Sequence, residues 1–237
     1  MEGAVNLRSF FSSTFTSAHP GRTSYAQSGE DLIIDYALTA AGIAGRSYLD
    51  VGSGDPVQLS NTFLFYQMGY RGVLVEPDPQ VCDKARRVRP GDRVLNIGIG
   101  AHASTGRNFY MMNPPTLSTF SKEEAERYQS VGHTLNELIR VNVKTINSVL
   151  IEEFAFVPEI ISIDVEGLEL EILQALDVGR YRPYLFCVET LEYSPDGLGR
   201  KKTEINDLLG SEDYLLWADT YINSIFVDRR RWESHGR

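Results

Sequence analysis

Short apolar segments alternate with amphipathic segments along most of this chain, and no other feature constrains its fold as strongly. Each apolar segment is rich in Val, Ile, Leu or aromatic residues and lies close to Gly, Pro or acidic residues. These segments span residues 47–51, 71–76, 93–100, 159–164 and 184–190. Strands that alternate with helices usually form a parallel sheet with both faces covered, so the pattern predicts an α/β fold.

Two regions depart from this alternation. Residues 213–219 and 223–230 are apolar segments joined by a short polar turn, which predicts an antiparallel pair closing the sheet. About residues 101–142, an extended piece, a loop and a polar helix form an insertion in place of a simple crossover helix. Residues 1–24 show no sustained period, so we expect an N-terminal arm. No repeat or linker divides residues 25–237, which predicts a single domain.

One of the predicted helices covers residues 168–176. Its apolar side chains, among them Ile172 and Leu173, recur at helical spacing and form a single face. Glu169 and Glu171 fall outside that face, so we expect both to point away from the core.

Composition excludes several classes of protein. The 237 residues are 42% hydrophobic, enough for a core that needs neither disulfides nor a metal. A formal net charge of −9 argues against nucleic-acid and anionic-membrane partners, which repel an acidic protein. No apolar run approaches the ~18–20 residues of a membrane span. Cys82 and Cys187 stand far apart without a CxxC pattern, so we expect no zinc site and a cytoplasmic location.

A glycine-rich turn follows the first predicted strand, in the stretch Asp50-Val51-Gly52-Ser53-Gly54-Asp55. Glycines there let backbone N–H groups approach a ligand, although a plain strand-to-helix turn is the structural alternative. Glu76 ends the second strand, 26 positions after Asp50, where an acid can bind ribose hydroxyls. A dinucleotide fingerprint needs a third glycine, but Val57 stands there. The turn therefore favours a nucleoside without a pyrophosphate, and S-adenosylmethionine (SAM) fits better than NAD.

A second group of candidates lies at the end of the predicted central strand, in Asp164-Val165-Glu166. Either acid could attract a sulfonium cation or accept the proton of a substrate hydroxyl. The alternative is a structural one, because acids stabilise the first turn of a helix. Glu189 ends the next strand in a similar place. Three converging carboxylates could also hold a divalent cation through oxygen ligands, which leaves a metal cofactor open.

Taken together, five blocks of sequence resemble the FkbM family of SAM-dependent methyltransferases. The blocks are YAQSGEDLI, YLDVGSGDPVQLSNTFLFYQMGYRGVLVEPDP, NIGIG, LSTF and ISIDVEGLELEIL. The resemblance implies a class I SAM-methyltransferase fold, which is Rossmann-like. Such a fold has a mostly parallel seven-stranded sheet with an antiparallel closing strand and helices on both faces. It also implies methylation of a hydroxyl oxygen on a sugar or natural product.

The resemblance further implies roles for single residues. Glu76 would bind the ribose with Pro77 beside it, and Asn96 and Ile97 would flank the adenine. Asp164 would lie nearest the transferred methyl. The candidates at the methionine end of SAM are Asp50, Gly52, Ser53, Gly54 and Asp55.

The match is not complete in the glycine-rich turn. The family commonly has Ala-Asn after the first glycine, where this chain has Ser53-Gly54-Asp55-Pro56.

The stretch that begins at Gln27 matches the family's leading Gln-x-Gly-Glu-Asp motif through Gly29 and Glu30. The resemblance implies that this stretch folds over the cofactor and that Gln27 contacts it. The alternative is an ordinary helix start, capped by Ser28 together with Asp31.

These observations predict a SAM-dependent O-methyltransferase with Asp164 and Glu166 as catalytic residues. The acceptor would be a small molecule or a glycan. Its wall would come from the insertion, through Pro114, Pro115, Leu117, Ser118 and Phe120. Two alternatives stay open: a nicotinamide-dependent oxidoreductase, and a catalytically inactive SAM-fold binding module. A homodimer is expected only because it is the commonest soluble assembly.

Overall fold

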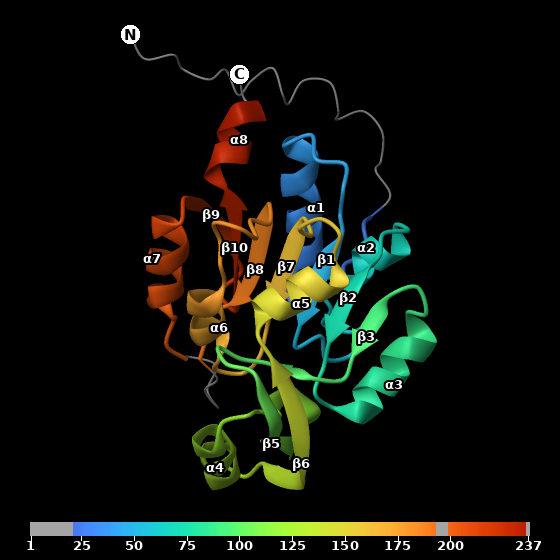
Figure 1. Cartoon of the computed structure of the whole chain (residues 1–237), viewed down its shortest axis with the longest axis vertical. Coiled ribbons are helices and arrows are strands. Elements are labelled where there is room, and N and C mark those ends of the chain that lie inside the picture. Colours follow the sequence, from blue (N-terminus) through green and yellow to red (C-terminus); the bar gives the residue numbers. More distant parts are fainter. Residues whose placement is uncertain (1–20, 193–198, 236–237) are drawn as a thin grey trace.

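The computed structural model describes residues 21–192 and 199–235, so most of the expected N-terminal arm lies outside the described residues. Its main element is a seven-stranded sheet in the order β3-β2-β1-β7-β8-β10-β9 (Figure 1). These strands are β1 (Tyr48–Val51), β2 (Gly72–Val75), β3 (Arg93–Leu95), β7 (Ile160–Ile163), β8 (Leu185–Glu189), β9 (Tyr214–Asp219) and β10 (Asn223–Asp228). β1 pairs in parallel with β2 and β7, whereas β10 is antiparallel to both β8 and β9. This confirms the predicted sheet and its antiparallel closing strand.

Helices cover both faces of the large sheet. They are α1 (Glu30–Ala40), α2 (Phe63–Gln67), α3 (Pro79–Val88), α5 (Ile146–Glu153), α6 (Glu169–Ala175), α7 (Thr203–Ser211) and α8 (Arg229–His235). Strand residues such as Leu49 and Ile161 pack with α5, α6 and α7, whereas Tyr48 and Ile160 pack with α1, α2 and α3 on the opposite face. Successive side chains of a strand point to opposite faces, which explains why continuous apolar strands need helices on both sides.

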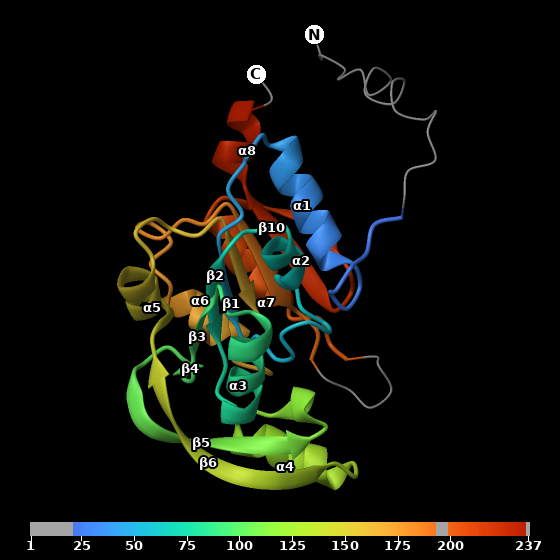
Figure 2. The ribbon, with the colours of Figure 1, turned by 90° about the vertical axis from the view of Figure 1, so that its right-hand side faces the viewer.

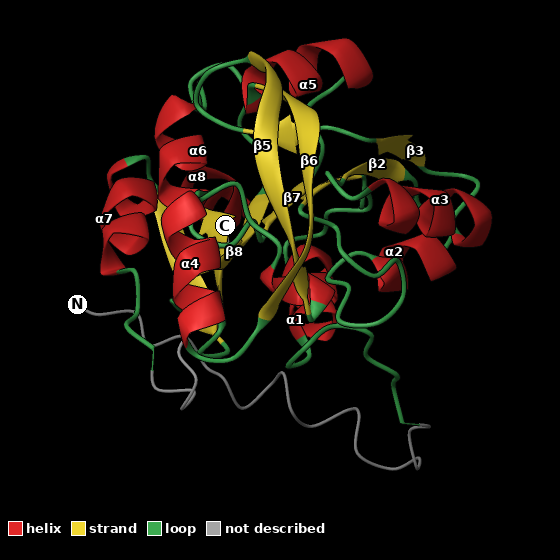
Figure 3. Ribbon diagram, turned by 90° about the horizontal axis from the view of Figure 1, so that it is seen from below, coloured by secondary structure: helices red, strands yellow, loops and turns green. Residues whose placement is uncertain are grey.

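A three-stranded sheet in the order β4-β6-β5 forms the predicted insertion. It consists of β4 (Gly98–Ile99), β5 (Ser104–Asn113) and β6 (Thr134–Lys144), with the short 3-10 helix η1 (Pro115–Leu117) and α4 (Lys122–Ser130) between β5 and β6. Figure 2 shows this sheet and α4 at the lower end of the molecule, below the strands of the large sheet. Seen from below, β5 and β6 lie in front of it (Figure 3). The insertion therefore stands next to one end of the parallel strands.

Two predictions about strands need correction. Residues 93–100 do not form one strand, because β3 belongs to the large sheet and β4 to the small one. The chain leaves the large sheet at Asn96, whose side-chain amide donates to the carbonyl oxygens of Glu76 and Pro77. The sequence also suggests a short strand at about residues 141–145, whereas β6 begins at Thr134. Within the described residues, no helix is long and apolar enough to cross a membrane.

Candidate active site

A cavity of about 420 Å³ opens where the parallel strands end. Its lining comes from the turns after β1, β2, β7 and β8 and from the inner side of the small sheet. The lining residues that matter below are Gln27, Gly52–Asp55, Glu76, Pro77, Ile97, Phe109, Leu117, Ser118, Phe120, Asp164–Glu166 and Glu189. In open α/β sheets, ligands bind in this position, beyond the carboxyl ends of the strands.

The glycine-rich turn is pressed against the end of β7. The backbone N–H groups of Gly52 and Ser53 donate to the carbonyl oxygen of Val75, and Gly52 has a φ of 77°. A Cβ at position 52 would lie 1.7 Å from the carbonyl oxygen of Asp164. Gly54 also has a positive φ, but a Cβ there would meet nothing within 4 Å. The turn is therefore packed on its Gly52 side and open at Gly54, where a ligand can approach the backbone.

Glu76 joins the turn to the end of β2. Its Oε2 atom accepts the N–H of Gly54 at 3.0 Å, and its Oε1 atom accepts the N–H of Asp78 at 2.9 Å. The side chain is buried, and this burial raises the pKa of the Glu76 carboxyl to about 7, although the two N–H donors oppose the rise.

Asp164, Glu166 and Glu189 meet at the opposite side of the cavity. One carboxylate oxygen from each lies within 4.8 Å of the other two. Burial, and after it the charge of neighbouring carboxylates including Glu169, raises the pKa of all three carboxyls, whereas the ammonium of Lys202 opposes the rise. The pKa is about 7 for the Asp164 carboxyl and about 8 for the Glu166 carboxyl, and acids that titrate there suit proton transfer near neutral pH.

The segment before α1 forms another part of the wall through Gln27. Asp31 holds this segment by accepting the hydroxyl of Ser24 at 2.6 Å and the N–H of Tyr25 at 2.7 Å. Buried Glu30 anchors it to the turn between β9 and β10, where its Oε1 atom accepts the Thr220 hydroxyl and the Asn223 side-chain amide.

The expected cap by Ser28 is wrong, although a helix does start here. The N-cap of α1 is Gly29, which is in the left-handed conformation and makes no side-chain cap. Glu30 instead accepts the N–H of Ser28 at 2.7 Å.

Three predicted site residues, Asp50, Asn96 and Pro114, are not among the described residues that line the cavity. Asp50 is buried beneath α2, where it accepts the Thr62 hydroxyl at 2.5 Å. Its side chain lies on the opposite face of β1 from that of Val51, because side chains alternate along a strand. Asn96 lines a separate, smaller cavity with Pro77, which itself borders both. Direct ligand contacts by Asp50 and Asn96 therefore do not follow from the geometry.

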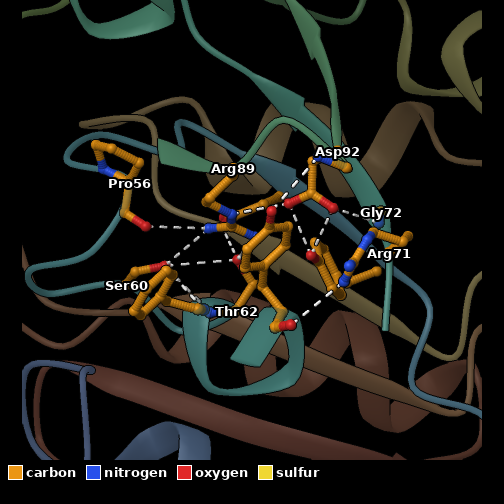
Figure 4. A network of polar contacts seen from close by, with 12 residues as sticks. Pro56, Ser60, Thr62, Arg71, Gly72, Arg89 and Asp92 are labelled. Atoms are coloured by element: carbon orange, nitrogen blue, oxygen red, sulfur yellow. Dashed lines mark hydrogen bonds and ion pairs between the residues drawn. The ribbon is translucent and has the colours of Figure 1, made fainter. Parts of the chain in front are cut away.

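Sequence reasoning missed the buried Arg89, whose polar contacts with Pro56, Thr62 and Asp92 are drawn in Figure 4. Its guanidinium donates to Asp92 at 2.8 Å, to the hydroxyl of Thr62 at 3.1 Å and to the carbonyl oxygen of Pro56 at 3.4 Å. Thr62 thus connects Arg89 to the carboxylate of Asp50. Arginines at helix ends are usually solvated, so no sequence signal distinguishes Arg89 from its neighbours Arg86 and Arg87.

Leu59 is another residue that the sequence does not reveal. It lines the cavity, is 57% exposed and has a φ of 59°, which is unusual for a residue other than glycine. Glu166 shares this left-handed conformation, with a φ of 54°. Such backbone strain is common at functional sites.

The strand order and the position of the cavity define the class of protein. A parallel sheet closed by an antiparallel strand, with a glycine turn after β1 and an acid after β2, is the class I SAM-dependent methyltransferase fold. The family model described as methyltransferase FkbM domain matches residues 50–216, more than half of the chain. The chain therefore belongs to the FkbM family of methyltransferases. No curated protein matches its sequence.

Several solved structures of methyltransferases align with most of the chain at low identity. A TehB-like SAM-dependent methyltransferase from Corynebacterium glutamicum is 13% identical, with 88% of this chain and 90% of that chain covered and a TM-score of 0.43. Precorrin-6y C5,15-methyltransferase from Geobacter metallireducens is 11% identical, with coverages of 88% and 93% and a TM-score of 0.43. An O-methyltransferase from Bacillus cereus in complex with SAH is 11% identical, with coverages of 89% and 82% and a TM-score of 0.41. Likenesses this distant carry no argument about the substrate.

Proposed function

We propose that the protein transfers the methyl group of SAM to a hydroxyl oxygen of a small-molecule or glycan acceptor. One observation carries the proposal: the glycine-rich turn, Glu76 and the carboxylates of Asp164 and Glu166 border a single cavity. The turn and Glu76 suit a nucleoside at one side, and the acids suit a cationic methyl donor and a hydroxyl at the other.

Within this proposal, Glu76 accepts the ribose hydroxyls, with Pro77 beside it and Ile97 against the adenine. The methionine end of SAM lies along the turn of Gly52, Ser53, Gly54 and Asp55, and Gln27 covers it. Asp50 acts from behind, through Thr62, and Asn96 acts by shaping the end of β2. Their roles are structural here rather than direct contacts.

The reaction is an in-line displacement. Bound SAM supplies an electrophilic methyl on a sulfonium. As the acceptor oxygen bonds to the methyl carbon and the carbon–sulfur bond breaks, Asp164 accepts the hydroxyl proton and S-adenosylhomocysteine (SAH) leaves. Glu166 lies beside Asp164 and acts on the acceptor. Holding the two reactants in line can supply ~7–11 kcal/mol of the acceleration.

The acceptor is a sugar or natural product in this proposal, as the family resemblance implies. The small sheet supplies Phe109 to the cavity, and the segment between β5 and α4 supplies Leu117, Phe120 and the hydroxyl of Ser118. Apolar faces with a few polar groups suit ring-shaped, hydroxylated molecules. The homodimer and the cytoplasmic location remain predictions.

A divalent cation is the alternative occupant at Asp164, Glu166 and Glu189, because their oxygens lie close enough to share one ion. The cation would lower the pKa of the acceptor hydroxyl, and the acids would be its ligands. EDTA added to an active preparation separates the two mechanisms, since full activity after chelation rules out a metal.

Thermal unfolding with SAM, SAH, NAD or no ligand tests the proposal. A ligand present at a hundred times its dissociation constant adds ~2.7 kcal/mol to the free energy of unfolding. For a chain of this length, that raises the midpoint temperature of unfolding by several degrees. We expect SAM and SAH to raise the midpoint temperature of the wild type and NAD to leave it unchanged. We expect neither SAM nor SAH to raise the midpoint of Glu76→Ala. No shift with SAM or SAH would refute the proposal, and a shift with NAD alone would favour the oxidoreductase. A protein that binds SAM but methylates none of a broad panel of hydroxylated acceptors would favour the inactive binding module.

A further inference from the structure

The turn that carries the two acids is strained. Between β7 and α6, Glu166 has a φ of 54° and Gly167 a φ of 105°. A non-glycine residue in the left-handed region costs roughly 1–2 kcal/mol, so such a conformation persists only where neighbouring groups hold it.

Glu169 holds this turn from inside the protein. Its Oε1 atom accepts the N–H of Val165 at 3.1 Å and the N–H of Gly167 at 3.2 Å, so it binds the residues before and after Glu166, and the Val165 N–H belongs to the peptide that directly follows Asp164. Its Oε2 atom accepts the ammonium of Lys202 at 2.7 Å. The Glu169 side chain is fully buried, contrary to the expectation that it points away from the core. One carboxylate thus bridges the turn and the start of α7.

The insertion holds the same turn from the other side. The Thr119 hydroxyl donates to the carbonyl oxygen of Glu166 at 3.3 Å, and the Tyr128 hydroxyl donates to the Glu166 carboxylate at 3.2 Å. These contacts fix Glu166 itself, whereas Glu169 is bonded to the N–H groups on both sides of it. The direction of the Asp164 carboxylate therefore depends on the backbone that Glu169 restrains.

We infer that Glu169, held in place by Lys202, is a positioning residue that orients the Asp164–Gly167 turn so that the Asp164 carboxylate faces the sulfonium of SAM. This inference rests on the proposed function. It assigns no contact with SAM or acceptor to Glu169, which acts through the backbone of the turn.

The difference between SAM and SAH affinity measures this orientation, because the two ligands share every group except the methyl and the positive charge on sulfur. A carboxylate about 4 Å from a unit charge in water contributes roughly 1 kcal/mol, which is about fivefold in a dissociation constant. Isothermal titration calorimetry of both ligands gives the ratio of their dissociation constants for each variant. A merely structural residue would change both constants together and leave the ratio unchanged.

Three variants of helix α6 form the test. Glu169→Ala removes the single oxygen that accepts both N–H groups of the turn, and we expect the preference for SAM over SAH to fall by about fivefold. Glu169→Gln keeps an oxygen that can accept from Val165 and Gly167 but sets an amide N–H donor against the Lys202 ammonium, so we expect it to retain part of the wild-type preference. Glu171→Ala is the matched control, since this glutamate is exposed on the same helix, and we expect no change.

An unchanged ratio in Glu169→Ala, or an equal loss in Glu169→Gln, would overturn the inference. If Glu169→Ala does not fold, Glu169→Asp takes its place, because a carboxylate one methylene shorter is drawn back from both N–H groups. A wild-type protein that binds neither ligand would refute the proposed function together with the inference. Wild-type binding with an unchanged ratio in the variants would refute the inference alone.

Discussion

Gly52 lies so close to Asp164 that there is no room for a side chain at position 52. A Cβ there would lie 1.7 Å from the Asp164 carbonyl oxygen and would clash with it. The N–H of Asp164 in turn donates to the carbonyl oxygen of Val51 at 3.0 Å. The glycine-rich turn and the acidic turn are therefore built against each other. A change in one of them moves the other.

Gly52→Ala should destabilise the protein by about 3 kcal/mol or more, because the new methyl meets fixed backbone and φ stays positive. Gly54→Ala is the matched control: its φ is also positive, but the space around it is open, so we expect a loss of about 1–2 kcal/mol. Urea unfolding of both variants checks the comparison. Equal losses would show that the contact with Asp164 has no energetic weight.

Glu76 should make stability depend on pH. Its pKa in the folded protein is raised to about 7 from an ordinary value of 4.5, so the folded state holds the proton more tightly than the unfolded chain. The contribution of a protonated Glu76 is complete below pH 4.5 and is lost as the pH rises through 7. Between pH 4.5 and 7, the free energy of unfolding of the wild type should fall by about 3 kcal/mol relative to that of Glu76→Gln. Parallel curves for both proteins in chemical denaturation would contradict this prediction.

The affinity for SAH should depend on pH in the opposite direction. In the proposed function, Glu76 accepts the ribose hydroxyls, which favours the ionised carboxylate. Raising the pH from 6 to 8 should therefore strengthen SAH binding by about tenfold, given a pKa near 7 in the free protein. SAH is the better probe because it has no sulfonium charge to interact with the other acids. Calorimetry on Glu76→Gln, which has no carboxylate to titrate, should show a nearly flat profile.

Asp164→Asn should lower methyl transfer by at least about a hundredfold, since the amide cannot accept the hydroxyl proton. SAH affinity should stay close to wild type, because the proposed ribose and methionine contacts are untouched. The measurement is single-turnover transfer of labelled methyl to an acceptor found by screening. Unchanged transfer would remove Asp164 from the mechanism.

Arg86 in α3 and Arg89, which directly follows that helix, offer a direct comparison of exposed and buried ion pairs. Arg89 and Asp92 are completely buried and 2.8 Å apart, whereas Arg86 and Asp83 form an exposed pair at 2.9 Å. Arg89→Met should lower the free energy of unfolding by about 3–5 kcal/mol, because it leaves the carboxylates of Asp92 and Asp50 without their cation. Arg86→Met should cost less than about 1 kcal/mol. Similar losses in thermal or urea unfolding would show that the Arg89 network is not the support of the turn.

The sequence predicts the parallel sheet because its strands are buried on both faces and read as unbroken apolar runs. It also predicts Glu76 and the acids after β7, because both follow a strand directly and so lie at the same edge of the sheet. The direction of Asp50 is different. Side chains alternate between the two faces of a strand. In an apolar run that helices cover on both faces, the sequence does not indicate to which face a given side chain, such as that of Asp50, points.

Other residues depend on contacts between distant segments. Arg89 looks like any basic residue near a helix end until Pro56 and Thr62 fold over it. Glu169 looks like a solvated acid in a first helical turn until Lys202, 33 positions later, reaches its carboxylate. Periodicity describes one helix at a time, so it cannot identify partners that another helix or loop supplies.

The link between Glu30 and Asn223 spans 193 positions of sequence and holds the wall that carries Gln27. During synthesis, Gln27 precedes the β9–β10 turn that secures its neighbour by almost two hundred residues. Contacts of such long range form late in folding. The wall that carries Gln27 is therefore secured only once β9 and β10 have joined the sheet, so one side of the pocket depends on strands made long after it.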